Sequence, residues 1–538
     1  MSNHSSNLKS RRSFLMEGFI AGAVAVNRVR AADADSASSV VETTAGKVRG
    51  ALQQNVNVFR GIPYAASTEG DARFMPPAKV QPWTGIREAI KLGPRAPQQT
   101  ANAGIAPEWA ALDRREPMGE DCLCLNIWTP NASPRTKLPV MFWLHGGGFA
   151  GGSGGHVAYD GTQLAAKHDV VVVTVNHRLN AFGYLYLADF GGEKYANSAN
   201  LGMQDIVAAL AWVRDNIAGF CGDPNNVTIW GQSGGAWKVA TLLAMPSAKG
   251  LYHKAIQQSG PLLKGVSREA ANNGLDIFMS ILGLRPSPEG ADALQKLPME
   301  KLLEAARAPN LSLAPVVDGR TLPSNPFEPV GPPFSASVPL LIGTNATEMT
   351  FFPGTPLDPI DDTELHNRVR ANLHAADADV DRVVAAYRKG TPGISNIDAY
   401  LAIAADNWDR IDSITEVERK IAAGKAPVYM YYFNWRSPVR EGKLKAMHCM
   451  EIPFVFDHVD ECKGVVGSGQ ERYALANKMS NAWAAFARTG NPNHKGLAKW
   501  SPYSTSHRNT MIFDKECKSM DDPRREERIT LTNLAHRA

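Results

Sequence analysis

Three almost continuous apolar runs, each bounded by turn residues, constrain the fold of this 538-residue chain more than any other feature. They span residues 138–144, 170–175 and 227–230. A strand that is covered on one face alternates apolar and polar residues, whereas a strand covered on both faces is apolar throughout, as in parallel sheets. The sequence therefore predicts a parallel sheet with other elements packed on both of its faces.

The segment between the second and third runs has the spacing of a helix. Between residues 200 and 220, apolar residues recur every three or four positions. Strand, helix and strand in alternation predict βαβ units and the α/β class. Further elements are expected as strands at 254–258, 338–342 and 426–433, a helix at 475–489, and antiparallel strands along one edge between 46 and 62. Because no repeat or linker appears after Val40, we predict a single domain over residues 35–538.

Composition excludes two classes of protein. Hydrophobic residues make up 44% of the chain and charged residues 20%, which argues against a disordered chain. The formal net charge is +4, with 57 basic against 53 acidic residues and no long basic run. No nucleic-acid groove is therefore predicted.

Cysteine spacing gives no sign of a metal centre. None of the six cysteines forms a C-x-x-C pair, and Cys122 and Cys124 are too close together for the usual metal spacing. We predict buried thiols with at most one or two disulfides and no metal site.

The amino terminus resembles an export signal. Arg11 and Arg12 are followed by a modest apolar stretch from Gly18 to Val26, and then by small residues up to Ala34. The stretch is too short to cross a bilayer as a helix, so no stable membrane anchor is expected. The pattern predicts a twin-arginine signal over residues 1–34 and a periplasmic or secreted protein, with a disordered basic tail as the alternative.

A G-x-S-x-G motif follows the third apolar run. In Gly231-Gln-Ser-Gly-Gly235, a strand must turn sharply into a helix so that the Ser233 hydroxyl stands clear of the sheet. The turn crowds the positions two before and two after the serine, and glycine relieves that crowding because it has no Cβ. The motif predicts Ser233 as a nucleophile; a tight turn with a solvated serine is the alternative.

A glycine loop, 146–148, follows the first apolar run. Acyl transfer builds negative charge on a carbonyl oxygen, so backbone N–H groups must already point at its position. We assign the N–H groups of Gly147, Gly148 and Gly234 as these donors. The alternative is a flexible loop without this role.

Chain order selects the partners of the nucleophile. In a strand–serine–helix arrangement of this kind the acid comes next in the chain and the histidine last. Glu348, directly after an apolar strand, is preferred as the acid over Asp318. His448, in the loop after residues 426–433, is preferred as the base over His458, while His494 lies in a polar turn.

Taken together, these residues resemble the type B carboxylesterases, which include bacterial para-nitrobenzyl esterases, mammalian carboxylesterases and cholinesterases. The resemblance runs from about Gly46 to Phe513. Besides the serine turn, the glycine loop and the two partner loops, it is carried by segments 59–64, 120–128, 176–178, 202–205, 212–224, 258–260 and 315–319. It implies the α/β-hydrolase fold: a large, mostly parallel central sheet flanked by helices, with a small antiparallel N-terminal sheet.

The resemblance also implies an activity. It points to a carboxylic ester hydrolase that needs no cofactor, acts on small-molecule esters and uses Ser233, His448 and Glu348 as a triad through an acyl-enzyme. It further implies an ion pair between Arg73 and Glu120. Amide, carbamate or lactone hydrolysis by the same triad stays an alternative, and a non-catalytic binding protein on the same scaffold is a remote one.

Three positions depart from the family pattern. Gln232 stands where the family usually has Glu, which argues against cationic choline esters, and Gly234 stands where it often has Ala. The partner expected for a family disulfide at Cys122 is Ala96, so we expect no such bridge. A cholinesterase-like aromatic gorge is not indicated. Phe149, Trp237, Phe351 and Phe352 are candidates for lining the pocket, with core packing as the alternative for each.

Overall fold

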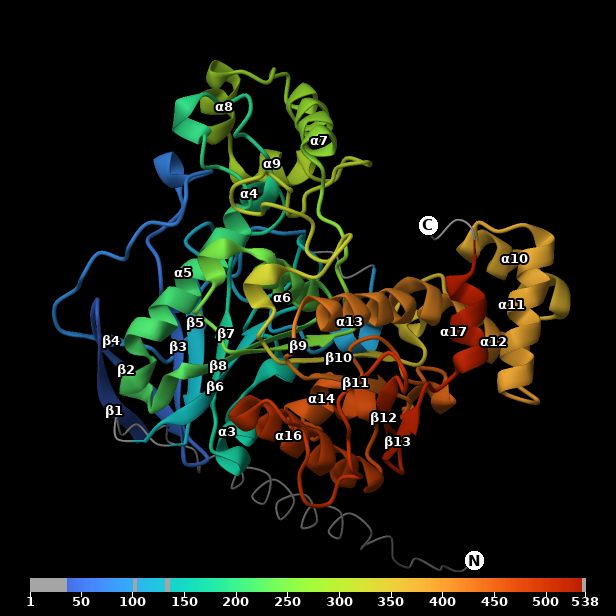
Figure 1. Cartoon of the computed structure of the whole chain (residues 1–538). Coiled ribbons are helices and arrows are strands. Elements are labelled where there is room, and N and C mark those ends of the chain that lie inside the picture. Colours follow the sequence, from blue (N-terminus) through green and yellow to red (C-terminus); the bar gives the residue numbers. More distant parts are fainter. Residues whose placement is uncertain (1–35, 100–103, 131–135, 535–538) are drawn as a thin grey trace, which may run out of the picture.

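The computed structural model describes residues 36–99, 104–130 and 136–534 (Figure 1). The segment for which an export signal is predicted lies outside these ranges, so that interpretation stays a prediction. Within them, no helix is both long enough and apolar enough to cross a bilayer.

One sheet forms the centre of the described structure (Figure 1). Its strands are, in spatial order, β1 (Ser36–Thr43), β2 (Gly46–Gln53), β3 (Val56–Pro63), β5 (Cys124–Thr129), β7 (Val171–Val175), β6 (Leu138–Leu144), β8 (Gly222–Gln232), β9 (Lys254–Gln258), β10 (Leu340–Asn345), β11 (Val428–Phe433), β12 (Asn509–Phe513) and β13 (Lys518–Asp521), with β4 (Ile86–Glu88) beside β2. From β7 to β12 the neighbours are parallel. The strands β1, β2, β3 and β5 pair antiparallel and join the sheet through β7, and β4 pairs parallel with β2. The predicted mostly parallel sheet with an antiparallel N-terminal edge is confirmed.

The apolar runs are buried on both faces, which is the condition they were predicted to meet. Along β6, Val140 and Phe142 pack into one hydrophobic cluster, while Met141 and Trp143 pack into another on the opposite face. Both clusters are closed off by helices. The helices α5 (Leu201–Asn216), α6 (Gly234–Ala244) and α13 (Ile411–Ala423) cover the first face, and α3 (Thr162–His168) and α16 (Glu471–Thr489) cover the second.

Two groups of helices stand away from the sheet. The first contains α7 (Arg268–Ile281), α8 (Pro288–Gln295) and α9 (Met299–Ala305), and the second contains α10 (Asp362–Leu373), α11 (Asp377–Gly390), α12 (Asn396–Ala405) and α17 (Arg525–Thr532). Each group has a hydrophobic cluster of its own. The sequence analysis did not predict these helices.

The predicted ion pair between Arg73 and Glu120 is present and buried. The guanidinium donates from Nε to Oε2 at 2.7 Å and from Nη2 to Oε1 at 2.5 Å. Arg73 also donates to the carbonyl oxygens of Gln295 and Leu297, near the end of α8. The pair thereby ties the first helix group to the segment that precedes β5.

Candidate active site

Ser233 occupies the bend between β8 and α6. Its φ of 58° and ψ of −127° are unusual for a residue with a Cβ, and its N–H donates to the carbonyl of Gln258 at 2.8 Å. A Cβ on Gly235 would lie 2.0 Å from the carbonyl oxygen of Leu144, and one on Gly231 would lie 2.6 Å from the backbone of Gly235. The structure therefore contains the strand–turn–helix and the crowding that the motif predicts.

The glycine loop turns back over this bend. Gly147 and Gly148 have φ values of 91° and 61°, which glycine adopts without strain. The position of a Cβ on Gly234 would be 2.3–2.4 Å from backbone atoms of Gly148. The loop after β6 and the first residue of α6 are therefore in direct backbone contact, next to Ser233.

Glu348 and His448 meet although 100 residues separate them. The His448 Nδ1 lies 2.6 Å from the Glu348 Oε2, and both side chains are buried. The other carboxylate oxygen of Glu348 accepts from the Ser259 hydroxyl at 2.7 Å and from the Asn345 N–H at 2.5 Å. Three donors therefore fix the carboxylate, and it in turn fixes the imidazole with Nδ1 as the protonated nitrogen.

Ser233 and His448 line one cavity of about 310 Å³, together with residues 146–148 of the glycine loop. Within the described chain, no hydrogen bond joins the Ser233 hydroxyl to the imidazole. Instead the Gln232 Nε2 lies 3.0 Å from the His448 Nε2, while the Gln232 Oε1 accepts from the Cys449 thiol at 3.2 Å. In free enzymes the hydrogen bond between nucleophile and base is often long and tightens only when substrate binds.

The competing acid and the polar-turn histidine lie elsewhere. Asp318 accepts from the Thr321 hydroxyl at 2.7 Å and from the N–H groups of Arg320 and Leu322, so it stabilises a turn. The His494 Nε2 is 3.0 Å from the carbonyl of Lys478. Neither residue lines the cavity that contains Ser233.

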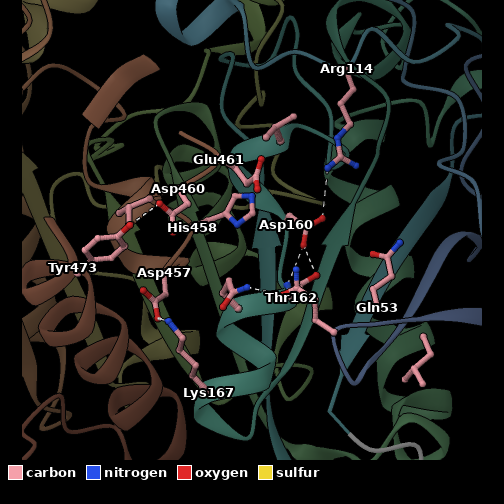
Figure 2. A pocket seen from close by; sticks show the side chains of 15 residues that line it. Gln53, Arg114, Asp160, Thr162, Lys167, Asp457, His458, Asp460, Glu461 and Tyr473 are labelled. Carbon is pink, nitrogen blue, oxygen red and sulfur yellow. Dashed lines mark hydrogen bonds and ion pairs between the residues drawn. The ribbon is translucent and has the colours of Figure 1, made fainter. Parts of the chain in front are cut away.

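His458, the rival base, lines a different pocket of about 490 Å³ (Figure 2). This pocket is strongly charged, and two of its ion pairs join lining residues: Lys167 with Asp457 at 2.6 Å, and Arg114 with Asp160 at 3.5 Å. Burial lowers the pKa of His458. The structure does not bring His458 to the serine.

The match to known proteins is extensive. A model of the carboxylesterase family matches residues 37–532. The para-nitrobenzyl esterase of Bacillus subtilis (strain 168) is 35% identical over 510 residues, which are 91% of this chain and 98% of the relative. The chain belongs to the carboxylesterase family. As a member of that family it is a carboxylic ester hydrolase.

Other relatives agree with this assignment. The carboxylesterase is 32% identical to the phenmedipham hydrolase of Pseudarthrobacter oxydans, over 89% of this chain and 95% of the relative. A solved carboxylesterase of Geobacillus stearothermophilus is 37% identical with a TM-score of 0.78, over 92% of this chain and 100% of that one. A solved esterase of Clostridium hathewayi that can hydrolyse aliphatic aromatic polyesters is 34% identical with a TM-score of 0.79, over 92% and 98%. The predicted α/β-hydrolase fold is confirmed.

The cavity of this carboxylesterase is rich in aromatic side chains. Of the four candidates from the sequence, Trp237, Phe351 and Phe352 line it, whereas Phe149 packs behind the loop against Tyr184. The sequence analysis missed further aromatic residues that line it, namely Trp109, Tyr159 and Trp408. The rings of Phe351, Phe352 and Trp408 stand 5.0–5.7 Å from the His448 ring. Trp109, Tyr159 and Trp408 were not among the predicted lining residues, because they come from segments far apart in the chain.

Buried carboxyl groups surround His448 in this carboxylesterase. Glu451 accepts from the side chains of Gln258 and Asn345, and its pKa is raised by burial and by the charge of Glu348. Asp409 is buried, and its pKa is raised well above the usual range for the same two reasons. Of these three buried carboxyl groups, Glu348 is the one that contacts His448.

The six cysteines of the carboxylesterase are free thiols, and all are buried. Cys122 has no disulfide partner, as the residue at position 96 led us to expect. Among the described residues, no group of three or more His, Cys, Asp or Glu side chains could hold a metal ion.

Replacing Gln232 by Glu tests how the site sets its working pH range. A carboxylate at this position would lie against the imidazole of His448 and favour its protonated form, which cannot act as a base. We expect the acid-side inflection of kcat/KM in Gln232→Glu to move upward by about one pH unit, as measured by pH-stat titration of a simple alkyl ester. An inflection that stays in place or moves to lower pH would contradict this expectation.

Proposed function

We propose that this carboxylesterase cleaves esters through an acyl-enzyme on Ser233, with His448 as general base and Glu348 as the group that orients it. The observation that carries the proposal is the 2.6 Å contact between Glu348 and His448 at the wall of the cavity that Ser233 lines. A buried carboxylate on Nδ1 leaves the lone pair on Nε2 and stabilises the imidazolium when it forms.

The proposed reaction has two halves. The Ser233 Oγ attacks the ester carbonyl while His448 takes its proton, and the negative oxygen accepts from the N–H groups of Gly147, Gly148 and Gly234. The tetrahedral intermediate then expels the alcohol, which leaves with the proton from His448. Water, deprotonated by His448, releases the acid in the same way. For this to happen the Gln232 amide must turn away from the His448 Nε2.

The cavity indicates the kind of ester. Its aromatic lining and volume of about 310 Å³ suit a neutral ester with a compact aromatic or apolar group. Two relatives are named for para-nitrobenzyl esters and for aliphatic aromatic polyesters, which supports the same choice. Amides and carbamates need a leaving nitrogen to be protonated, which makes them the harder alternative.

A fluorophosphonate probe tests the nucleophile directly. We expect one probe to attach to Ser233 in the active protein and turnover of p-nitrophenyl esters to stop in proportion. A panel of esters that differ in acyl length and alcohol bulk then ranks the substrates. Labelling at another residue, or hydrolysis that survives complete labelling, would contradict the proposal.

We also propose that the protein is exported by the twin-arginine route, on the basis of Arg11 and Arg12 and the apolar stretch that follows them. Replacing both arginines by Lys should keep the protein in the cytoplasm at full length, as measured by fractionation and mass spectrometry. Replacing Arg28 and Arg30 by Lys is the matched control and should leave export intact. Equal export of the two double variants would rule the proposal out.

A further inference from the structure

The peptide planes of the glycine loop are fixed by hydrogen bonds to their carbonyl oxygens. In a trans peptide the C=O and the N–H point in opposite directions, so fixing a carbonyl also aims the next N–H. The carbonyl of Gly146 accepts from the His145 Nδ1 at 2.9 Å, and that of Gly147 accepts from the Gly151 N–H at 3.0 Å. These two contacts set the directions of the N–H groups of Gly147 and Gly148.

Lys238 holds the two outer planes of the same loop. Its Nζ donates to the carbonyl of His145 at 3.0 Å and to the carbonyl of Gly148 at 2.8 Å. Lys238 lies one turn into α6, and its side chain is fully buried. One amine group therefore bridges the carbonyl that precedes the loop and the last carbonyl of the loop.

Burial of the Lys238 amine lowers the stability of the folded protein. Among the described residues, no carboxylate forms an ion pair with Lys238; its other recorded contact is the Phe149 ring, whose centroid is 5.6 Å from Nζ. Burial lowers the pKa of Lys238 to about 7. A buried amine without a carboxylate destabilises a protein, so packing alone does not account for it.

Two buried histidines lie near Lys238 behind the loop. The rings of His145 and His177 stack at 4.9 Å. Burial, with a smaller contribution from the charge of Lys238, lowers the pKa of His145 to about 3 and that of His177 well below its usual range. Both imidazoles are therefore neutral near pH 7, and His145 in this form can donate from Nδ1 to Gly146.

We propose that Lys238 is a positioning residue for ester hydrolysis: by bridging the carbonyls of His145 and Gly148, it holds the loop so that the N–H groups of Gly147 and Gly148 face the reacting carbonyl. The proposal rests on the proposed function, because it assigns these N–H groups to the oxyanion. A clamp of this kind acts on the transition state more than on the bound ester, because the negative oxygen forms only during the reaction.

Lys238→Met, which keeps the length of the side chain and removes its donors, tests the clamp. We expect kcat to fall about 10- to 100-fold with KM changed by less than about threefold. The affinity for a trifluoromethyl ketone, which Ser233 converts into an oxyanion, should fall by a similar factor. Lys238→Gln keeps one N–H donor group, so its kcat should lie between those of the wild type and Lys238→Met. If thermal unfolding shows that Lys238→Met does not fold, the Gln variant replaces it in the test.

Lys254→Met is the matched control. Lys254 is also buried, its pKa is lowered to about 8 by burial, and it donates to Asn226 at the far end of β9 from Ser233. Its kinetic constants should stay within about twofold of the wild type. The proposal is overturned if Lys238→Met keeps kcat within that range, or if KM rises as much as kcat falls while the ketone binds normally. Ser233→Ala in the same series separates the proposal for Lys238 from the proposed function, since turnover by that variant would contradict the proposed function itself.

Discussion

Ser233→Ala should lower kcat for a p-nitrophenyl ester by about 10⁴- to 10⁶-fold, because it removes the oxygen that forms the acyl-enzyme in the proposed mechanism, while the glycine loop and His448 stay in place. The change keeps the Cβ, so the strained backbone at φ 58° is retained. We therefore expect the midpoint of thermal unfolding to change little. Steady-state kinetics and circular dichroism measure the two quantities on one preparation.

Ser233→Gly is an informative companion to this variant. It removes the same hydroxyl and also relieves the strain, since glycine adopts positive φ without cost. It should be as inactive as the alanine variant but more stable by about 1 kcal/mol in the free energy of unfolding. Turnover of either variant above about 1% of the wild type would contradict the assignment of the nucleophile.

Glu348→Gln should lower kcat by about 10³- to 10⁴-fold with a smaller effect on KM. The amide is close in shape to the carboxylate, but it has no charge with which to stabilise the imidazolium of His448. The Ser259 hydroxyl and the Asn345 N–H still favour an oxygen on their side, which would turn the amide nitrogen toward the His448 Nδ1 and select the wrong tautomer. The pre-steady-state burst of p-nitrophenol measures the loss in the acylation step.

Asp318→Asn is the control for this prediction, because the carboxylate of Asp318 was the alternative acid and stabilises a turn. Its kcat should stay within about threefold of the wild type, even if the variant is less stable. A loss of less than about tenfold in Glu348→Gln, or an equal loss in both variants, would show that the acid has been assigned wrongly.

Much of the fold follows from local pattern. The run at 138–144 has the predicted bounds, because continuous apolar residues between turn residues are typical of strands buried on both faces. The strand at 254–258 also has its predicted bounds, although only Ala255 and Ile256 in it are apolar. The helix at 200–220 is found as α5 and a short continuation to Phe220. By contrast, β12 and β13 were not predicted, and β5 was quoted only as a family motif; β13 is exposed and short, so its sequence carries little pattern.

The candidate site likewise has one part that local sequence predicts and another that depends on distant segments. The serine turn and the glycine loop are formed by neighbouring residues. Backbone crowding requires glycine there, so the glycines appear in the sequence as a motif. Chain order narrowed the histidines, but His448 and His458 lie in the same loop region, and spacing does not say which of them faces the serine. Packing against Phe351 and Trp408 together with the contact to Glu348 distinguishes them.

The sequence alone determined the class of fold, the family and the residues that form the turn, because these depend on neighbours in the chain. The tertiary structure decided which side chains from distant segments come together: the aromatic lining of the cavity, the Gln232 amide at His448, and the Lys238 ammonium behind the glycine loop. The physical reason is that such contacts depend on how helices and loops pack across the sheet, and residue spacing along the chain does not record that geometry.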